Sequence, residues 1–193
     1  MDIKQIVEVL RAGGVILYPT DTVWGIGCDA TNEAAVQKVF AIKRRAESKS
    51  LVLLAADLDM VALHVKEIPG IAIDLVEVND APMTIVYPGA QGLAPSVVAE
   101  DGSVGIRIPL YEEGQQGGGA FCHELVRRLR KPLVSTSANI SGEPTPKCFA
   151  DISEEIKQAV DLVVDPAMEK TSTGKASQII KLEVDGRVQI IRA

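Results

Sequence analysis

Residues 32–54, NEAAVQKVFAIKRRAESKSLVLL, place a helix, a basic cluster and a strand in succession, and this order decides the fold class. Asn32 is a favourable N-cap, and apolar residues recur at helical spacing between positions 35 and 40. The uninterrupted apolar run at 51–54 is typical of a buried strand. A helix followed so closely by a buried strand indicates a domain in which helices cover a sheet.

Helical and strand patterns alternate along the rest of the chain. Apolar stripes at helical spacing occupy 3–10, 71–78, 121–129 and 153–160. Short apolar runs typical of strands occupy 15–18, 84–87, 104–108, 133–135, 162–164 and 188–191. The alternation predicts an α/β (α+β) fold with one open, twisted, mixed sheet flanked by helices. No shift in composition divides the chain, so we expect a single domain over residues 1–193. The glycine-rich stretch 114–119 is predicted to be a flexible loop tip.

Composition narrows the class of protein. A formal net charge of -6 argues against nonspecific coating of DNA or RNA as the main activity. No apolar run is long enough for a membrane span, and the first residues lack the basic and then apolar build of a signal peptide. Cys28, Cys122 and Cys148 are widely spaced, without a Cys-x-x-Cys pair. This favours a reduced, cytoplasmic protein with neither a disulfide framework nor a zinc site.

A basic cluster follows the helical stripe in this acidic chain and consists of Lys43, Arg44, Arg45 and Lys49. Lys43 lies four residues after Val39, so it continues the buried stripe and points toward the domain. A buried ammonium needs an anionic partner, which is either a structural carboxylate or a bound phosphate. Basic residues also suit a helix C-terminus or a solvated face, and position alone leaves these alternatives open.

Two polar segments follow predicted strands. Residues 18–25 read YPTDTVWG and combine two threonine hydroxyls, a carboxylate and the Trp24 ring; taken alone, they favour ordinary turn chemistry. Residues 135–145 read STSANISGEPT and hold five hydroxyls and an amide, more than a plain turn requires. Such groups supply neutral donors for phosphate oxygens or a nucleobase, which favours a ligand site at the second segment.

These segments and the basic cluster together resemble the YrdC-like threonylcarbamoyl-AMP synthase family. The matching elements, in family order, are Pro-Thr-Asp-Thr-Val-Trp-Gly at 19–25, Lys-x-Arg at 43–45, Lys-Ser-Leu at 49–51, Pro-Met-Thr at 82–84, Gly-Ile-Arg-Ile-Pro at 105–109, Ser-Ala-Asn at 137–139, Ser177 and Arg192. They span nearly the whole chain. The chain departs from the family where Ala46 replaces the usual proline, where residues 79–81 precede Pro82, and where Gln178 follows Ser177.

The resemblance implies a YrdC-like fold with a large, concave, positive cavity and a nucleotidyltransferase reaction. L-threonine, bicarbonate and ATP, accompanied by Mg²⁺ without identified protein ligands, would give threonylcarbamoyl-AMP and diphosphate. The product would pass to a downstream threonylcarbamoyl transferase complex for the N6-threonylcarbamoyladenosine modification of tRNA. The alternatives are a same-fold paralogue and a module that binds double-stranded RNA or tRNA without this activity.

The resemblance also implies roles for individual residues. Threonine would be held by Thr22, Arg107, Ser135 and Ser177, with Arg107 on its carboxylate. ATP would contact Arg45, Lys49, Ser103, Ser137, Asn139, Thr145 and Arg192. Lys43 and Arg45 are the expected catalytic residues, and no residue is expected to bind a metal directly.

Overall fold

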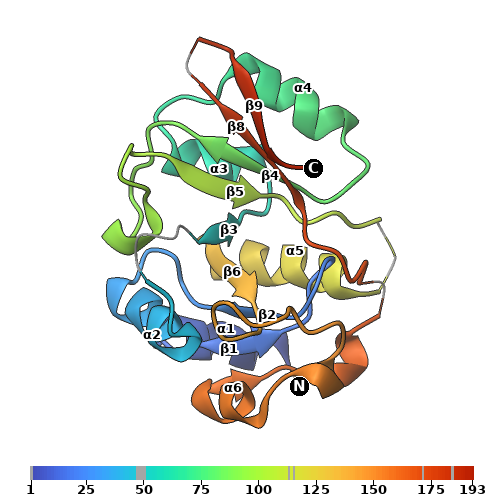
Figure 1. Ribbon diagram of the computed structural model, residues 1–193. Helices are drawn as coiled ribbons and strands as arrows, with labels where there is room; N and C mark the ends of the chain where they lie inside the picture. The colour runs from blue at the N-terminus through green and yellow to red at the C-terminus, as the bar shows by residue number, and fades with distance from the viewer. Residues whose placement is uncertain (1, 47–50, 113, 115, 171, 184) are drawn as a thin grey trace.

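The computed structural model describes residues 2–46, 51–112, 114, 116–170, 172–183 and 185–193. Within these residues nine strands form one sheet in the order β7-β1-β2-β6-β3-β5-β4-β8-β9 (Figure 1). The strands are β1 (Ile16–Tyr18), β2 (Gly25–Gly27), β3 (Val52–Leu54), β4 (Met83–Tyr87), β5 (Val104–Arg107), β6 (Leu133–Ser137), β7 (Leu162–Val163), β8 (Gln178–Leu182) and β9 (Val188–Arg192).

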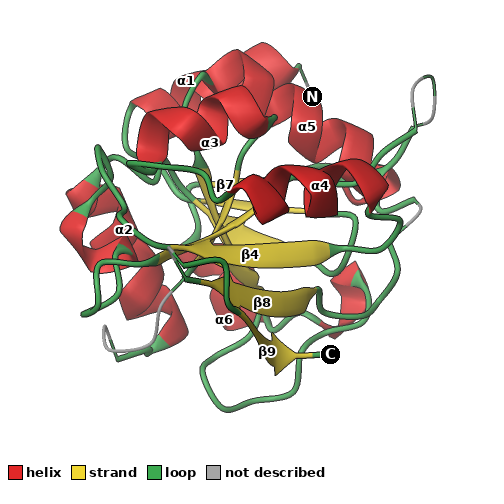
Figure 2. Ribbon diagram, turned by 90° about the horizontal axis from the view of Figure 1, so that it is seen from above, coloured by secondary structure: helices red, strands yellow, loops and turns green. Residues whose placement is uncertain are grey.

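Six α-helices are formed by the described residues. They are α1 (Ile3–Arg11), α2 (Glu33–Lys43), α3 (Leu58–His64), α4 (Gly70–Val78), α5 (Gly118–Leu129) and α6 (Glu154–Ala159). Figure 2 shows α1, α3, α4 and α5 on one side of the molecule and α6 on the opposite side. No helix in this part of the chain is long and apolar enough to span a bilayer.

The sheet is mixed, as the alternation of helices and strands predicts. Strand pairs β1–β7, β3–β5 and β4–β8 are parallel. The remaining neighbours, β1–β2, β2–β6, β3–β6, β4–β5 and β8–β9, are antiparallel. The fold-class prediction of an open mixed sheet flanked by helices is therefore confirmed.

Local sequence signals start several of the helices. The side chains of Asn32, Asp57 and Ser153 each accept a hydrogen bond from the backbone N–H three residues later, at 3.2, 2.8 and 3.4 Å. These caps satisfy donors that would otherwise have no intrahelical partner. The chain enters α4 through Pro69, whose restricted φ suits a helix start.

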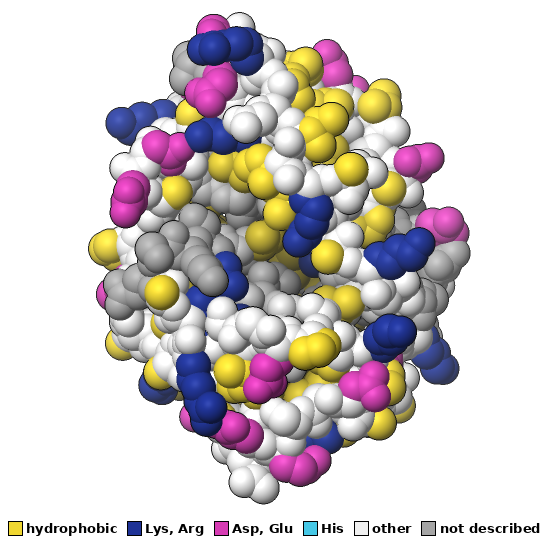
Figure 3. All heavy atoms as spheres, in the orientation of Figure 1, with side chains coloured by type: hydrophobic (Ala, Val, Ile, Leu, Met, Phe, Trp, Pro, Cys, Tyr) yellow, Lys and Arg dark blue, Asp and Glu magenta, His cyan; other side chains and the backbone are white. Residues whose placement is uncertain are grey.

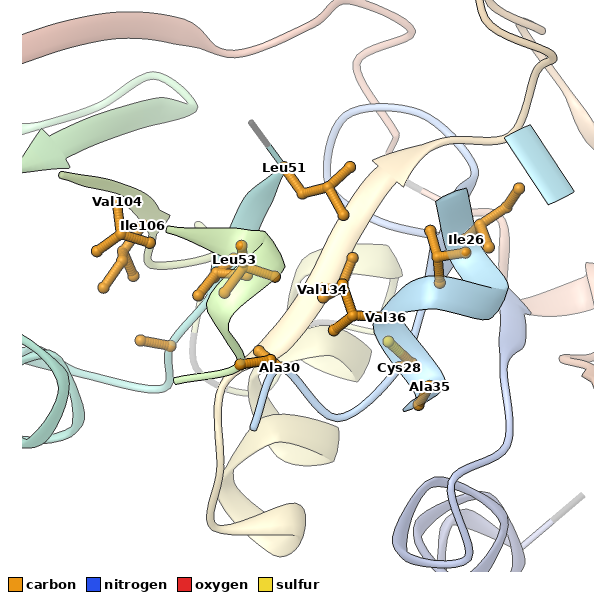
Figure 4. Packing of buried hydrophobic residues seen from close by; sticks show 14 of the residues in the cluster. Ile26, Cys28, Ala30, Ala35, Val36, Leu51, Leu53, Val104, Ile106 and Val134 are labelled. Carbon is orange, nitrogen blue, oxygen red and sulfur yellow. The ribbon is translucent and has the colours of Figure 1, made fainter. Parts of the chain in front are cut away.

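Two apolar clusters pack on the sheet because side chains alternate along each strand. Leu17 and Leu53 join one cluster, which includes residues of α2, α3 and α4. Their neighbours Ile16 and Leu54 join the other, which is formed with α1 and α5. Figure 4 shows part of the first cluster, where β2, β3 and β6 meet α2. The strands thus carry buried residues on both faces.

The prediction for the glycine-rich stretch is wrong at its last two residues. Gly118 and Gly119 begin α5 and are buried. A Cβ added at Gly118 would lie 2.1 Å from the carbonyl oxygen of Thr20, and one at Gly119 would lie 1.9 Å from that of Leu110. Backbone therefore packs directly against backbone here, which fixes where α5 begins beside residues 20–21.

Candidate functional site

A pocket of about 250 Å³ lies where the strand ends and loops of the sheet's central part converge. Figure 3 shows the molecule hollowed near the middle of one face, with Lys and Arg side chains at the edge of the hollow. The pocket is lined by Thr20, Thr22, Val23, Trp24, Gly25, Arg45, Leu51, Val52, Arg107, Ser135, Thr136, Ser137, Thr145, Ala176, Ser177, Ile179 and Arg192.

Most of the site residues predicted from the sequence meet in this pocket. The lining includes Thr22, Arg45, Arg107, Ser135, Ser137, Thr145, Ser177 and Arg192. Lys43, Ser103 and Asn139 do not line it. Lys49 lies outside the described residues. The structure therefore brings together residues from both polar segments and from positions as far apart as Thr20 and Arg192.

Strand register explains how polar residues of the sheet come to line one pocket. Leu133 and Ser135 are two residues apart on β6, so their side chains share a face. Leu133 packs in the α1–α5 cluster, while Ser135 lines the pocket. On β3, Val52 is opposite Ser135 and Leu54 is opposite Arg107. Ser135 and Arg107 therefore lie on the same sheet face as Leu54 and Leu133, so the pocket adjoins the α1–α5 cluster.

Arg107 is held by a carboxylate of the protein itself. Its Nη1 donates to Oδ1 of Asp21, and both side chains are buried. The second carboxylate oxygen of Asp21 accepts from the backbone N–H of Leu110 at 3.3 Å, and Nη2 of Arg107 lies 3.4 Å from Oγ1 of Thr22. The sequence alone does not indicate that Asp21 is the partner of Arg107. The position of Asp21 between two threonines after a strand was the available signal.

The last strand supplies a second arginine. On β9, Arg192 donates from Nε and Nη2 to the carbonyl oxygen of Ser177, at 2.8 and 2.6 Å. The hydroxyl oxygens of Ser177 and Thr84 lie 2.8 Å apart. Burial lowers the pKa of the Arg192 guanidinium, and the charge of Arg107 adds to this effect. The two arginines are therefore close enough to repel each other, and a bound anion would relieve that repulsion.

The basic cluster divides at the end of α2. Lys43 is the last helical residue and is 1% exposed, so the prediction that it continues the buried stripe is confirmed. Arg44 caps the helix with a left-handed φ of 49°, and its exposed side chain pairs with Glu155 of α6. Arg45 then lines the pocket, where burial lowers the pKa of its guanidinium. The three consecutive cations therefore lie in different places: Lys43 in the interior, Arg44 on the surface and Arg45 in the pocket.

Lys43 does not line the pocket, although the resemblance implies a catalytic role for it. Its Nζ donates to the carbonyl oxygen of Ser137 and, at 2.7 Å, to that of Asn139. These backbone dipoles take the place of the anionic partner predicted for it. Burial lowers the pKa of the Lys43 ammonium to about 8, and the nearby charge of Arg45 contributes.

Two further predicted residues make contacts within the protein. Ser103 is buried and donates from Oγ to Oδ1 of Asp101 at 2.6 Å. The Asn139 side chain accepts a hydrogen bond from the hydroxyl of Ser137 and donates to the carbonyl oxygen of Glu143 at 2.7 Å. Asn139 therefore shapes the loop that carries Ser137.

Trp24 lines the pocket and is 1% exposed. Its ring lies 4.9 Å from that of Phe149, measured between centroids. Its indole Nε1 is buried and has no hydrogen-bond partner among the described residues. The sequence presents Trp24 as an aromatic ring beside a turn and as part of the family motif at 19–25, and neither feature indicates a role for its indole N–H.

The charge of the pocket suits an anionic ligand. Three arginines, Arg45, Arg107 and Arg192, contribute to the lining, and no carboxylate does so among the described residues. Serine and threonine hydroxyls provide additional neutral donors. Arginine binds carboxylate or phosphate through two parallel hydrogen bonds and remains charged at any relevant pH. The described residues include no cluster of three or more His, Cys, Asp or Glu side chains that could hold a metal ion.

Comparison with known proteins identifies relatives over nearly the whole chain. A family model, Sua5_yciO_yrdC, described as "Telomere recombination", matches residues 8–193. The threonylcarbamoyl-AMP synthase of Stenotrophomonas maltophilia is 33% identical over 168 residues, which cover 86% of each chain. The enzyme of the same name from Pseudomonas aeruginosa is 33% identical over 165 residues, or 83% of each chain.

A solved structure shares both the fold and part of the sequence. The crystal structure of P. abyssi Sua5 complexed with L-threonine superposes with a TM-score of 0.81 at 25% identity. The match covers 93% of the present chain and 50% of the P. abyssi chain, so the present chain spans about half the length of that relative.

Proposed function

Because the chain belongs to the Sua5/YciO/YrdC family, we propose that it is an L-threonylcarbamoyl-AMP synthase. Relatives at 33% identity carry that name, and the P. abyssi structure was solved with L-threonine bound. The observation that carries the proposal is the convergence of Arg45, Arg107 and Arg192 on one hydroxyl-lined pocket. The names of the relatives favour this enzyme over an RNA-binding module.

The reaction needs alignment of anions more than it needs a dedicated base. The amine of threonine combines with bicarbonate, releasing water and leaving a carbamate. A carbamate oxygen then attacks the α-phosphorus of ATP, and the bond to the β-phosphate oxygen breaks to release diphosphate. Carbamate and triphosphate are both anionic, so their approach is opposed by repulsion. Fixed cations and oriented donors lower this barrier by positioning and by electrostatic stabilisation.

The proposed function divides the residues of the pocket between the two substrates. Thr22, Arg107, Ser135 and Ser177 are the proposed threonine contacts, and the Asp21 carboxylate holds Arg107 in place for that role. The proposed ATP contacts that line the pocket are Arg45, Ser137, Thr145 and Arg192. Lys49 stays a predicted ATP contact. For Ser103 and Asn139 we propose support of the site rather than direct contact, because neither lines the pocket.

The proposed reaction also implies a reaction class, a product, a metal ion and a location in the cell. It is a nucleotidyl transfer, in which the AMP moiety passes to the carbamate, and the product is a reactive mixed anhydride suited to a tRNA-modifying transferase. Mg²⁺ would accompany ATP, held by its phosphate oxygens and by water. The cytoplasm, where ATP and tRNA are available, is the proposed location.

The decisive test is diphosphate release by the purified protein. Release is expected only when ATP, L-threonine and bicarbonate are all present, and no release above an ATP-only control contradicts the proposal. Arg45→Ala should lower kcat/KM on the order of a hundredfold, because it removes a charge-assisted contact to the triphosphate. Arg44→Ala is the matched control, since the adjacent Arg44 side chain is exposed and directed at Glu155. Equal losses in the two variants would contradict the role of Arg45.

A further inference from the structure

Both ends of Lys43 are bonded to one short segment, residues 137–141. The ammonium donates to the carbonyl oxygens of Ser137 and Asn139, and the backbone carbonyl of Lys43 accepts from the N–H of Ser141 at 2.8 Å. The C-terminus of α2 is thereby joined to the loop that leaves β6, although the two are more than ninety positions apart in sequence.

The segment that Lys43 holds carries a pocket residue. Ser137 lines the pocket, while its neighbour Ala138 is 1% exposed and donates its N–H to the carbonyl oxygen of Trp24 at 2.9 Å. The Ser137 hydroxyl donates to the side chain of Asn139. The direction of that hydroxyl therefore depends on two supports, the Asn139 amide group and the carbonyls fixed by Lys43.

The position of the charge fits a support rather than a substrate contact. Lys43 is 1% exposed and does not line the pocket, whereas Arg45, two residues later, does. A charged donor shared between two carbonyls holds them more strongly than a neutral donor would. Its pKa of about 8 leaves the ammonium mostly protonated at neutral pH. Removing this donor takes away a hydrogen bond from each of the two partly buried carbonyls and frees the segment to move.

We propose that Lys43 is a positioning residue that cross-links the carbonyls of Ser137 and Asn139 and so fixes Ser137 in the pocket, without touching the nucleotide. The inference rests on the proposed function, because it treats the pocket as a nucleotide site. It replaces the expected catalytic role of Lys43 with an action through its neighbours.

A double-mutant cycle on Lys43 and Ser137 tests this dependence. The readout is the affinity for a non-hydrolysable ATP analogue, together with kcat and the KM for ATP from diphosphate release. Lys43→Met and Ser137→Ala are each expected to weaken analogue binding on the order of tenfold, with the KM for ATP rising more than kcat falls. Because Lys43 acts through Ser137, the double variant should lose little more than the weaker-binding single variant.

Lys38→Met is the matched control. Lys38 also lies on α2 and donates from Nζ to a backbone carbonyl, that of Gly13, at 3.1 Å, but it does not line the pocket. Its analogue affinity should equal that of the wild type. Lys43→Arg keeps a cationic donor and should retain more affinity than Lys43→Met. If Lys43→Met does not fold, the cycle is run with Lys43→Gln, whose neutral amide should hold the two carbonyls less strongly.

Three outcomes would overturn the inference. Losses that multiply in the double variant mean that Lys43 and Ser137 contact the nucleotide independently. A collapse of kcat with unchanged ATP KM and analogue affinity means that Lys43 acts on the reacting atoms. Unchanged analogue affinity and kinetics in Lys43→Met mean that the cross-link has no effect on the pocket. Absence of diphosphate release by the wild type contradicts the proposed function, while analogue binding still decides the role of Lys43.

Discussion

Arg107 and Asp21 form a buried ion pair that stands between two cavities. Arg107 lines the arginine-rich pocket, and Asp21 lines a neighbouring cavity of about 380 Å³. That second cavity also includes Asp80 and Glu112 in its lining. The pair therefore separates a basic cavity from an acidic one. It also joins β5 to the loop after β1, which fixes the Arg107 guanidinium on the basic side.

Breaking this pair should cost much of the protein's stability. Asp21→Asn leaves the Arg107 guanidinium buried without its carboxylate, and we expect the free energy of unfolding to fall by about 3 kcal/mol or more. Urea unfolding measures it. The control is Asp185→Asn, which breaks an exposed pair with Arg187 and should leave stability nearly unchanged. Similar losses in both variants would show that burial of the Asp21 pair is not what matters.

Gly118 is expected to tolerate no side chain. In Gly118→Ala the new Cβ would meet the Thr20 carbonyl oxygen at 2.1 Å, so α5 must shift away from residues 20–21, at a cost of about 2 kcal/mol or more. The shift should also weaken threonine binding, since Thr22 is close by in the chain. Gly70→Ala, at the first residue of α4 with no atom within 4 Å of the added Cβ, should change stability by less than about 0.5 kcal/mol.

Glycine should replace Arg44 with little change in the free energy of unfolding. Its φ of 49° is a conformation that favours glycine, so Arg44→Gly should be more stable than Arg44→Ala by about 1 kcal/mol. Both variants lose the exposed pair with Glu155, so their difference isolates the backbone. Thermal or urea unfolding of the two variants checks this. A more stable alanine variant would mean that the left-handed turn is absent in solution.

The buried ammonium of Lys43 predicts a pH dependence of stability. Its folded-state pKa of about 8 lies below the ordinary value of 10.5, so the folded protein releases this proton before the unfolded chain does. The contribution of Lys43 to the free energy of unfolding should therefore rise between these two pH values and be lost again as pH falls through 8. The stability of the wild type minus that of Lys43→Met, followed by urea unfolding across this range, should increase with pH. A flat difference would contradict the lowered pKa.

Features that follow from local periodicity could be predicted from the sequence. The inward direction of Lys43 follows from its spacing after Val39, and the caps at Asn32 and Asp57 follow from their place before an apolar stripe. The density of hydroxyls at 135–145 likewise predicts a ligand site there, and Ser135, Ser137 and Thr145 line the pocket.

Features that depend on tertiary placement could not be predicted. The Asp21–Arg107 pair joins residues 86 positions apart, one in the loop after β1 and one on β5, and these two strands are not neighbours in the sheet. The left-handed turn at Arg44 has no signal in an arginine, a residue type that seldom adopts positive φ. The loop prediction at Gly118 failed because glycine serves both mobile turns and close backbone packing, and composition does not distinguish these uses.

Because Arg192 lies on the outermost strand, a ligand bound in the pocket should stabilise that strand. β9 pairs only with β8 among the described strands, and its residues are exposed, so its local opening should require little free energy. A ligand held by Arg192 binds only the closed form and therefore raises the cost of that opening. Amide hydrogen exchange in β9 should accordingly slow as nucleotide is added, although the strand lies at the margin of the molecule. Ligand binding in the central pocket should thus reduce the local opening of the edge strand β9.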